Sequence, residues 1–385
     1  MTNAGHLPRR YPAWLPGLLL ATSLAGCGGR GAEPEAVRIG VLVNLPGSEG
    51  PPTVEAVELA AAAVNAAGGI EVGGARRPVE LFFEETQTAP EKAIEGARRL
   101  IQRQVVALIG PSRSRDAIAA AGAAEHARIP MISAAATHPQ LTAGKSYVFR
   151  VTFTDRFQGE ALGRFAVEGL GGRTAGILYD DASAYNRNLA MVFREAFESF
   201  GGQVVAFEHY TTGDMDFRRQ LEIIRAAEPQ VLFLPNYVEE IPTQARQARE
   251  LGIGAVLLGG DSWTLVSLAD QPYLEGAFFG VHWHLDETAV NSEARRFATA
   301  YRQAYGHDPS TQAALTYDAF GLLAHAIRRA GSDPEEIRQA LAEIEGYPGV
   351  TGPITFRSSG GDPPKPLVIA RIEHGIASRY MVIEP

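Results

Sequence analysis

Cysteine is nearly absent, since the 385 residues contain only Cys27. A lone thiol cannot form an intramolecular disulfide, so the folded chain depends on its packed core. No Walker A motif is present, and any ATPase activity would therefore need a separate subunit. The 35 Lys and Arg residues are outnumbered by 44 Asp and Glu residues, which leaves a net charge of −9. This acidic balance argues against nucleic acid as a partner.

Long apolar runs are also missing, and the apolar run at residues 14–25 is too short to span a bilayer as a stable helix. It follows the basic pair Arg9 and Arg10 and ends in the sequence LAGC at residues 24–27, which resembles a bacterial lipobox. We therefore predict a signal peptide over residues 1–26 and lipidation of Cys27. A flexible lipidated tether would cover residues 27–36 and hold an extracytoplasmic, membrane-anchored protein in the periplasm or at the cell surface.

The rest of the chain has room for two domains of ordinary size. Short apolar runs alternate with helical patterns of about 10–15 residues, which is typical of βαβ units and a parallel sheet. The first series predicts strands at residues 37–43, 79–84, 105–109 and 129–133. The second series predicts strands at residues 175–178, 204–207, 231–234 and 256–258. The chain is therefore expected to form two doubly wound α/β lobes with parallel sheets.

The last hundred residues depart from this alternation. After an apolar run at residues 277–281, the pattern predicts three helices over residues 292–305, 311–330 and 334–344. Residues 352–385 then alternate short apolar runs with turns, and we expect antiparallel strands there.

Two polar turns follow neighbouring strands near the middle of the first series. Gly110-Pro111-Ser112 ends the strand at 105–109, and a turn over residues 134–137 ends the strand at 129–133. In an open parallel sheet both turns lie at the carboxyl ends of strands, where ligands bind. They offer hydroxyls and backbone N–H groups, and the first also opens a helix. This arrangement indicates a site for an anion such as a carboxylate.

Short motifs in a fixed order extend over nearly the whole chain after Cys27. They are IGV (39–41), NAAGGI (65–70), IG (109–110) followed by serines, IS (132–133), AT (136–137) with Pro139, Arg150 with Asp155, QG (158–159), GD (213–214), DF (216–217), QAR (247–249), GGD (259–261), YDA (317–319), VTG (350–352) and ITF (354–356). Together they resemble the leucine/isoleucine/valine-binding family of periplasmic substrate-binding proteins, the type I receptors of ABC importers.

The resemblance implies two α/β lobes joined by three hinge crossovers, near residues 151–154, 282–285 and 349–352. The N-terminal lobe would then comprise residues 37–152 and 284–349, and the C-terminal lobe residues 153–283 and 350–385. Hinge closure would bury a small ligand between the loops of the two sheets, as in a Venus flytrap.

The resemblance also implies roles for particular residues. Ser114, the backbone N–H of Ala135 and Thr137 match positions that hold the α-carboxylate of an amino acid, with Ser112 as a close alternative and Ala136 in the same turn. Asp261 matches the acid that meets the α-ammonium, and Tyr185 and Tyr237 match tyrosines that close over the ligand. Elementary electrostatics agrees, because a buried zwitterion needs donors on one wall and a carboxylate on the other.

Other residues of the predicted site depart from the family pattern or leave alternatives open. Glu49 stands where the branched-chain receptors place an aromatic residue, which favours a polar or larger ligand. Trp263 would either line the cleft or pack beneath it. Arg113 and Arg115 would either be solvated or reach an extra acidic group.

An enzyme is the main rival class of protein. Ser262 lies in a Gly-Asp-Ser-Trp sequence that superficially resembles a hydrolase block, but no Asp-x-x-His sequence follows it. Ser112 and Ser114 follow Gly110 without the second glycine of a nucleophile elbow. His282 and His284 could bind a metal, although a structural role is favoured. We expect no catalytic residues, no cofactor and no metal.

The sequence therefore predicts the substrate-binding protein of an ABC importer for an amino acid or a similar small carboxylate. Its partners would be the ligand, the permease and ATPase subunits, and the membrane through Cys27. The alternative is a ligand-sensing or envelope-regulatory lipoprotein that uses the same fold without transport.

Overall fold

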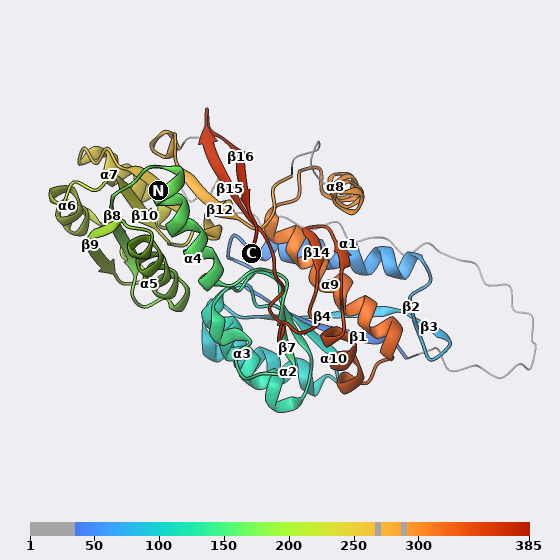
Figure 1. Cartoon of the computed structure of the whole chain (residues 1–385). Coiled ribbons are helices and arrows are strands. Elements are labelled where there is room, and N and C mark those ends of the chain that lie inside the picture. Colours follow the sequence, from blue (N-terminus) through green and yellow to red (C-terminus); the bar gives the residue numbers. More distant parts are fainter. Residues whose placement is uncertain (1–34, 266–270, 286–290) are drawn as a thin grey trace, which may run out of the picture. The chain divides into compact units, whose positions relative to one another are not determined.

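The computed structural model describes residues 35–265, 271–285 and 291–385 (Figure 1). The predicted signal peptide (1–26), Cys27 and nearly all of the predicted tether lie outside the described residues. Within the described ranges, no helix combines the length and the apolar content that crossing a membrane requires.

The first lobe contains a five-stranded sheet in the order β4-β1-β5-β6-β7, in which every neighbouring pair is parallel. Side chains alternate between its faces: Ile39 and Ile109 join one core, while Leu42 and Leu108 join another. Both faces are therefore covered by helices, as a doubly wound parallel sheet requires. The elements are β1 (Val37–Val43), α1 (Gly50–Ala66), β4 (Val79–Glu85), α2 (Pro90–Gln102), β5 (Ala107–Ile109), α3 (Ser114–Ala127), β6 (Met131–Ser133) and β7 (Val148–Arg150). A small hairpin of β2 (Ile70–Val72) and β3 (Ala75–Arg77), which the sequence reading missed, precedes β4.

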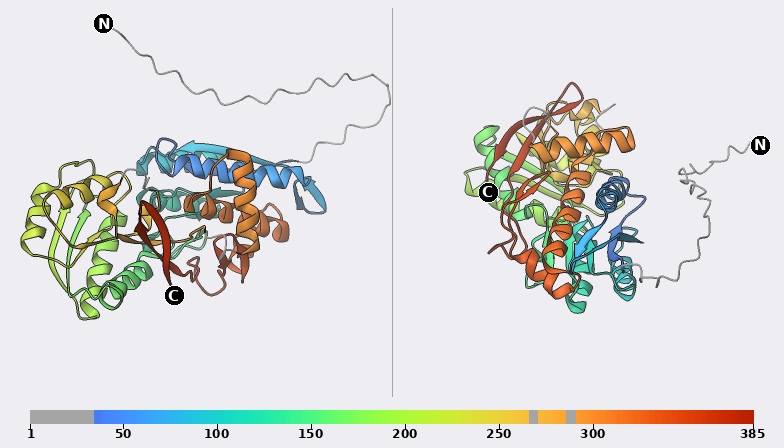
Figure 2. Two further views of the ribbon diagram at one scale, coloured as in Figure 1. Left: turned by 90° about the horizontal axis from the view of Figure 1, so that it is seen from above. Right: turned by 90° about the vertical axis from the view of Figure 1, so that its right-hand side faces the viewer.

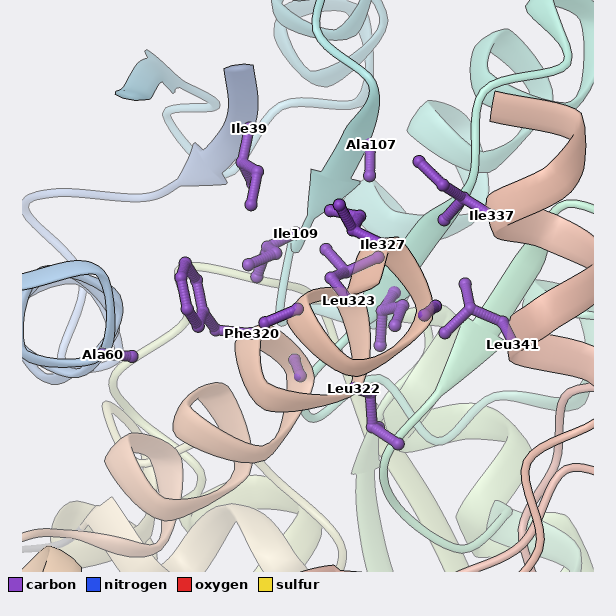
Figure 3. Close-up of a cluster of buried hydrophobic side chains, with 14 of the residues drawn as sticks. Ile39, Ala60, Ala107, Ile109, Phe320, Leu322, Leu323, Ile327, Ile337 and Leu341 are labelled. Atoms are coloured by element: carbon purple, nitrogen blue, oxygen red, sulfur yellow. The ribbon is translucent and has the colours of Figure 1, made fainter. Parts of the chain in front are cut away.

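Three late helices complete the first lobe, namely α8 (Ser292–Tyr305), α9 (Thr311–Ala330) and α10 (Pro334–Ala342). Figures 1 and 2 show these orange helices beside the blue and cyan elements of the first lobe, although they come from the last third of the chain. Figure 3 shows the core that joins them, where Phe320 and Leu323 of α9 and Ile337 of α10 pack against Ile39 and Ile109 of the sheet.

The second lobe contains a seven-stranded sheet in the order β16-β15-β12-β11-β10-β8-β9. Its first five strands in sequence are parallel, and β15 and β16 are added antiparallel at one edge, as the alternation in residues 352–385 predicted. The elements are α4 (Asp155–Arg164), a π-helical turn (Phe165–Gly169), β8 (Thr174–Asp180), α5 (Ala184–Ser199), β9 (Gln203–Tyr210), α6 (Arg218–Ala226), β10 (Val231–Leu234), α7 (Ile241–Glu250), β11 (Val256–Gly259), β12 (Phe278–Val281), β15 (Leu367–Glu373) and β16 (Ile376–Ile383).

Two connections between the lobes leave the sheets at residues 151–153 and 282–283. Val151 belongs to the core of the first lobe, whereas Phe153 belongs to a core of the second lobe. Val281 lies in a second-lobe core, and Trp283 packs with α8 and α9 in the first lobe. Each connection therefore changes lobes within three residues or fewer.

The third predicted crossover, which would have put residues 350–385 in the second lobe, is placed too early. Residues 350–362 stay with the first lobe, because Ile354 and Phe356 are buried in its core and the Phe356 ring lies 5.1 Å from that of Phe149. Asp362 accepts a 2.6 Å hydrogen bond from Nε of Arg150, which ends β7. The chain enters the second lobe only between Asp362 and Leu367, whose side chain lies in a second-lobe core. A hairpin of β13 (Tyr347–Gly349) and β14 (Gly352–Ile354) spans the predicted boundary at residue 350.

Helix α1 begins at Gly50. Glu49 is its N-cap, and the prolines that follow occupy the first turn, where a missing backbone N–H costs nothing. Thr53 lies inside the helix and donates its hydroxyl to the Glu49 carbonyl at 2.7 Å. This start places the Glu49 side chain at the edge of the sheet where the polar turns lie.

Truncating a core side chain of α9 tests whether this late helix packs against the sheet of the first lobe. Phe320 is 1% exposed, and Phe320→Ala should lower the free energy of unfolding by about 3–5 kcal/mol because it leaves a cavity. Phe200, which is 40% exposed, is the matched control, and Phe200→Ala should cost about 1 kcal/mol or less. Urea denaturation followed by circular dichroism measures both variants. Equal losses would contradict the packing of α9 described above.

Candidate ligand-binding site

A cavity of about 550 Å³, part of it open to solvent, is bounded by the polar turns of both sheets. It contains eight of the ten residues that the sequence assigned to the site: Glu49, Ser112, Ser114, Ala135, Thr137, Tyr185, Tyr237 and Asp261. The remaining two, Ala136 and Trp263, are not among its lining residues. The cavity therefore brings together turns as far apart in the sequence as Glu49 and Asp261.

The first turn of the first-lobe wall is fixed by close backbone contacts. Gly110 has a φ of +80°, and a Cβ there would lie 2.3 Å from the carbonyl oxygen of Leu42, so only glycine fits. The Ser133 hydroxyl donates to the Pro111 carbonyl at 2.7 Å and ties this turn to the next strand. Ser114, which is almost fully buried, then opens helix α3.

Arg150 fixes the second turn of this wall. Its buried guanidinium donates to the carbonyl of Ala136 at 2.9 Å and to that of His138 at 3.0 Å. Ala136 therefore turns its carbonyl toward Arg150 and is buried, which corrects the prediction that it lines the site. Its neighbours Ala135 and Thr137 face the cavity.

Asp261 supplies the negative charge of the second-lobe wall. Its Oδ1 accepts from the Tyr185 hydroxyl at 2.7 Å and from Nε2 of Gln158 at 2.8 Å, and its Oδ2 lies 2.9 Å from Nε2 of His282. Its own backbone N–H donates to Oε1 of Gln158 at 2.8 Å. Burial works to raise the pKa of this carboxyl, but the hydrogen bonds and the nearby His282 hold the pKa below its usual range. Asp261 is therefore a carboxylate at neutral pH.

His282 belongs to the site, although the sequence reading favoured a merely structural role. It lines the cavity, and its other nitrogen hydrogen-bonds the Thr152 hydroxyl. His284 instead contacts the Ala377 carbonyl at 3.0 Å, so the two histidines do not converge on a metal. Among the described residues, no group of three or more His, Cys, Asp or Glu side chains could hold a metal ion. The overlooked signal was that His282 follows β12 just as Asp261 follows the adjacent strand β11.

Arg113 is a contact between the lobes. Its Nε donates to Oε1 of Glu49 at 2.7 Å, and its guanidinium also hydrogen-bonds Glu239 of the second lobe. The guanidinium carbon lies 4.5 Å from the centre of the Tyr237 ring, and that ring lies 5.2 Å from the Tyr185 ring. Burial works to raise the pKa of Glu49, but the Arg113 charge holds the pKa below its usual range. Arg113 is therefore not simply solvated, because it contacts two acidic side chains of the protein itself.

Trp263 packs beneath the site. Its indole N–H donates to the Leu234 carbonyl at 3.0 Å, and its ring stacks on that of Phe279. Only 1% of the residue is exposed, so it supports the floor of the second-lobe wall without reaching the cavity. Ser262 and Thr264, on either side of it, line the cavity instead.

Comparisons with known proteins match this architecture. A model of the periplasmic binding protein family matches residues 36–377, so the chain belongs to that family. The leucine-, isoleucine-, valine-, threonine- and alanine-binding protein of Pseudomonas aeruginosa is 27% identical over 304 residues, which cover 77% of this chain and 78% of the relative.

Two solved structures match over most of their length. The crystal structure of the leucine-binding protein LivK of Thermotoga maritima has a TM-score of 0.84 and 31% identity, and the match covers 91% of this chain and 99% of that one. LivJ of Streptococcus pneumoniae, a branched-chain amino acid transporter substrate-binding protein in complex with isoleucine, has a TM-score of 0.84 and 30% identity over 91% and 100% of the two chains. The fold is thus the type I periplasmic binding protein fold, as the sequence motifs predicted.

Asp155, at the start of α4, makes a pH-dependent contribution to stability. Burial raises the pKa of this fully buried carboxyl to about 7, although Thr137 and Asn188 hydrogen-bond to it. The pKa in the unfolded chain is about 3.9. Between about pH 3.9 and about pH 7, Asp155 is protonated in the folded chain and ionised in the unfolded chain. The contribution of Asp155 to the free energy of unfolding therefore falls as the pH rises through this range.

We therefore expect the stability of Asp155→Asn relative to the unchanged protein to increase by about 2–4 kcal/mol between pH 4.5 and pH 8. Urea denaturation of both proteins across this range measures the difference, in which the titration of other groups cancels. A difference that does not vary with pH would show that Asp155 titrates normally.

Proposed function

We propose that the protein is the substrate-binding component of an ABC importer and that it binds an amino acid or a similar small carboxylate. The observation that carries the proposal is the opposition of two polar walls across one cavity. The first-lobe wall offers hydroxyls and backbone groups, and the second-lobe wall offers the buried carboxylate of Asp261.

A zwitterionic ligand matches both walls. Its carboxylate would accept hydrogen bonds from Ser112, Ser114, Thr137 and the backbone N–H of Ala135, close to the N-terminus of α3. Its ammonium would pair with Asp261, whose two oxygens accept three hydrogen bonds from side chains and can accept about four. Oδ2 therefore has room for a ligand N–H beside His282.

Membership of the periplasmic binding protein family supports a ligand-binding role without catalysis. LivJ of Streptococcus pneumoniae holds isoleucine, and the relative from Pseudomonas aeruginosa is named for five neutral amino acids. The cavity of this chain contains the ion pair of Glu49 and Arg113, so its lining is not purely apolar where the ligand side chain would lie. Transport would require separate permease and ATPase subunits, which this chain would supply with ligand.

The ammonium assignment is tested with Asp261→Asn. Because the variant keeps a hydrogen-bonding side chain but loses the charge, it should bind an amino acid about 30-fold or more weakly. The loss for the des-amino analogue of the same ligand should be much smaller. Isothermal titration calorimetry of leucine and 4-methylpentanoate, lysine and 6-aminohexanoate, and aspartate and succinate covers apolar, basic and acidic side chains.

Asp181→Asn is the matched control, because the Asp181 side chain is 51% exposed in the same lobe. It should leave both affinities within about twofold. Equal losses for an amino acid and its des-amino analogue in Asp261→Asn would refute the ammonium role. Binding of the des-amino acids alone would keep the carboxylate site and discard the amino-acid ligand.

We also infer that Cys27 is lipidated and anchors the protein outside the cytoplasm. The basic and apolar segments before LAGC support this inference, and two or more acyl chains suffice for stable anchoring. In a bacterial host, the full chain should sediment with membranes and incorporate labelled palmitate. Cys27→Ser should lose the label and leave the membrane fraction. A Cys27→Ser protein that is still labelled would contradict the assignment.

A further inference from the structure

Two smaller cavities adjoin the main one, and Arg113 lines all three. A side cavity of about 220 Å³, part of it open to solvent, lies in the first lobe, where Asn44, Thr86 and Asp116 contribute to its lining. An interlobe cavity of about 390 Å³, also partly open to solvent, is lined by Asp116 from the first lobe and by residues of the second lobe that include Glu240. Asp116 is therefore common to both flanking cavities. We call these two cavities together the acidic compartment.

Acidic side chains outnumber basic ones around Arg113. The two cations are Arg113 and Arg115, and the five acids that line the two flanking cavities or contact Arg113 are Glu49, Asp116, Asp180, Glu239 and Glu240. Arg113 is already paired with Glu49 and Glu239. The Arg115 side chain is 41% exposed, and its Nε lies 3.7 Å from Asp116, beyond hydrogen-bonding distance. The negative charge of the compartment therefore exceeds what its own cations balance.

Four buried oxygens on residues that line the compartment have no hydrogen-bond partner among the described residues. They are Oδ1 of Asp116, Oε2 of Glu240, Oδ1 of Asn44 and Oγ1 of Thr86, on residues that are 1%, 7%, 7% and 1% exposed. Asp180 differs, because its carboxylate accepts from Ala182 and Thr212. The carboxylate and amide oxygens of Asp116, Glu240 and Asn44 accept hydrogen bonds, and the Thr86 hydroxyl can also accept one, so a donor would satisfy any of the four.

Burial raises the pKa of Asp116 to about 6 and that of Glu240 to about 7. Both groups are thus carboxyls that lack a sufficient partner for their charged form. A buried ionised group without a partner is costly, and a cation in hydrogen-bond contact removes that cost. An acidic ligand group would add repulsion here, and an apolar one would leave the acceptors unsatisfied.

We propose that the ligand is a basic amino acid whose positively charged side-chain end is held in the acidic compartment by Asp116 and Glu240. This inference rests on the proposed function, in which the main cavity holds the amino and carboxylate groups. Ser112 and Glu49 line both the main and the side cavity, and Tyr237 lines both the main and the interlobe cavity. On this proposal, the ligand side chain would extend from the main cavity past these shared residues toward Asp116. Arg113 does not oppose the charge, because Glu49 and Glu239 balance it.

Matched ligand pairs test the proposal on the full chain, purified and stripped of bound ligand. Isothermal titration calorimetry compares lysine with norleucine and arginine with citrulline, pairs of similar length that differ in the terminal charge. The cationic member of each pair should bind at least about tenfold more tightly. In Asp116→Asn and in Glu240→Gln, the ratio of the affinity for the cationic member to that for the neutral member should fall to about threefold or less. Asp181→Asn, at an exposed position of the second lobe, should keep the ratio of the unchanged protein.

The outcomes separate the two proposals. If norleucine or citrulline binds as tightly as its charged counterpart, the basic-ligand inference is overturned while the amino-acid-binding function stands. If neither an amino acid of any class nor its des-amino carboxylate binds, the proposed function itself fails. If lysine and arginine are preferred but neither carboxylate variant changes the ratio, the assignment to the acidic compartment is wrong. The ligand comparison requires only the unchanged protein, so it is decisive even if a variant does not fold.

Discussion

The buried carboxylate of Asp261 is the constraint on which the site depends. A charge at this depth is stable only when donors surround it, and the chain supplies them from Gln158 on α4, Tyr185 on α5 and His282 after β12. His282 also bonds Thr152, in another connection between the lobes. The negatively charged wall of the cavity is thereby tied to two of the segments along which the chain changes lobes.

A buried guanidinium plays the corresponding part in the first lobe. Arg150 holds the carbonyls of the turn that carries Ala135 and Thr137, and it binds Asp362 far along the chain. Since an unpaired buried Arg would be costly, this pair explains why residues 350–362 remain with the first lobe. The two walls are thus each organised by one buried charge, one positive and one negative. Their opposition across the cavity is the basis of the proposed zwitterion site.

Arg113 joins the two lobes at the rim of this arrangement. It pairs with Glu49 in its own lobe, with Glu239 in the other, and lies over the Tyr237 ring. These contacts place charged groups where an apolar amino-acid side chain would need an apolar surface. Asp116 lies 3.7 Å from Arg115, but Oδ1 of Asp116 and Oε2 of Glu240 still have no hydrogen-bond donor among the described residues. The chain thus shares its fold and family with relatives named for neutral amino acids. The charges around Arg113 nevertheless favour a ligand whose side chain is not apolar.

Local patterns were sufficient to predict the sheets and the two polar turns of the first lobe, because apolar runs followed by polar turns identify the carboxyl ends of strands, where ligands bind. The roles of Ser114, Thr137 and Asp261 came instead from the resemblance to the leucine/isoleucine/valine-binding family. Neither source predicted the contacts between side chains: His282 beside Asp261, Glu49 against Arg113, and Trp263 beneath the floor. The tertiary structure alone decided these contacts, and it also placed the third connection after Asp362, where the sequence had put it near residue 350. The reason is physical, since the pairing of a buried charge depends on residues distant in sequence, whose proximity no local pattern records.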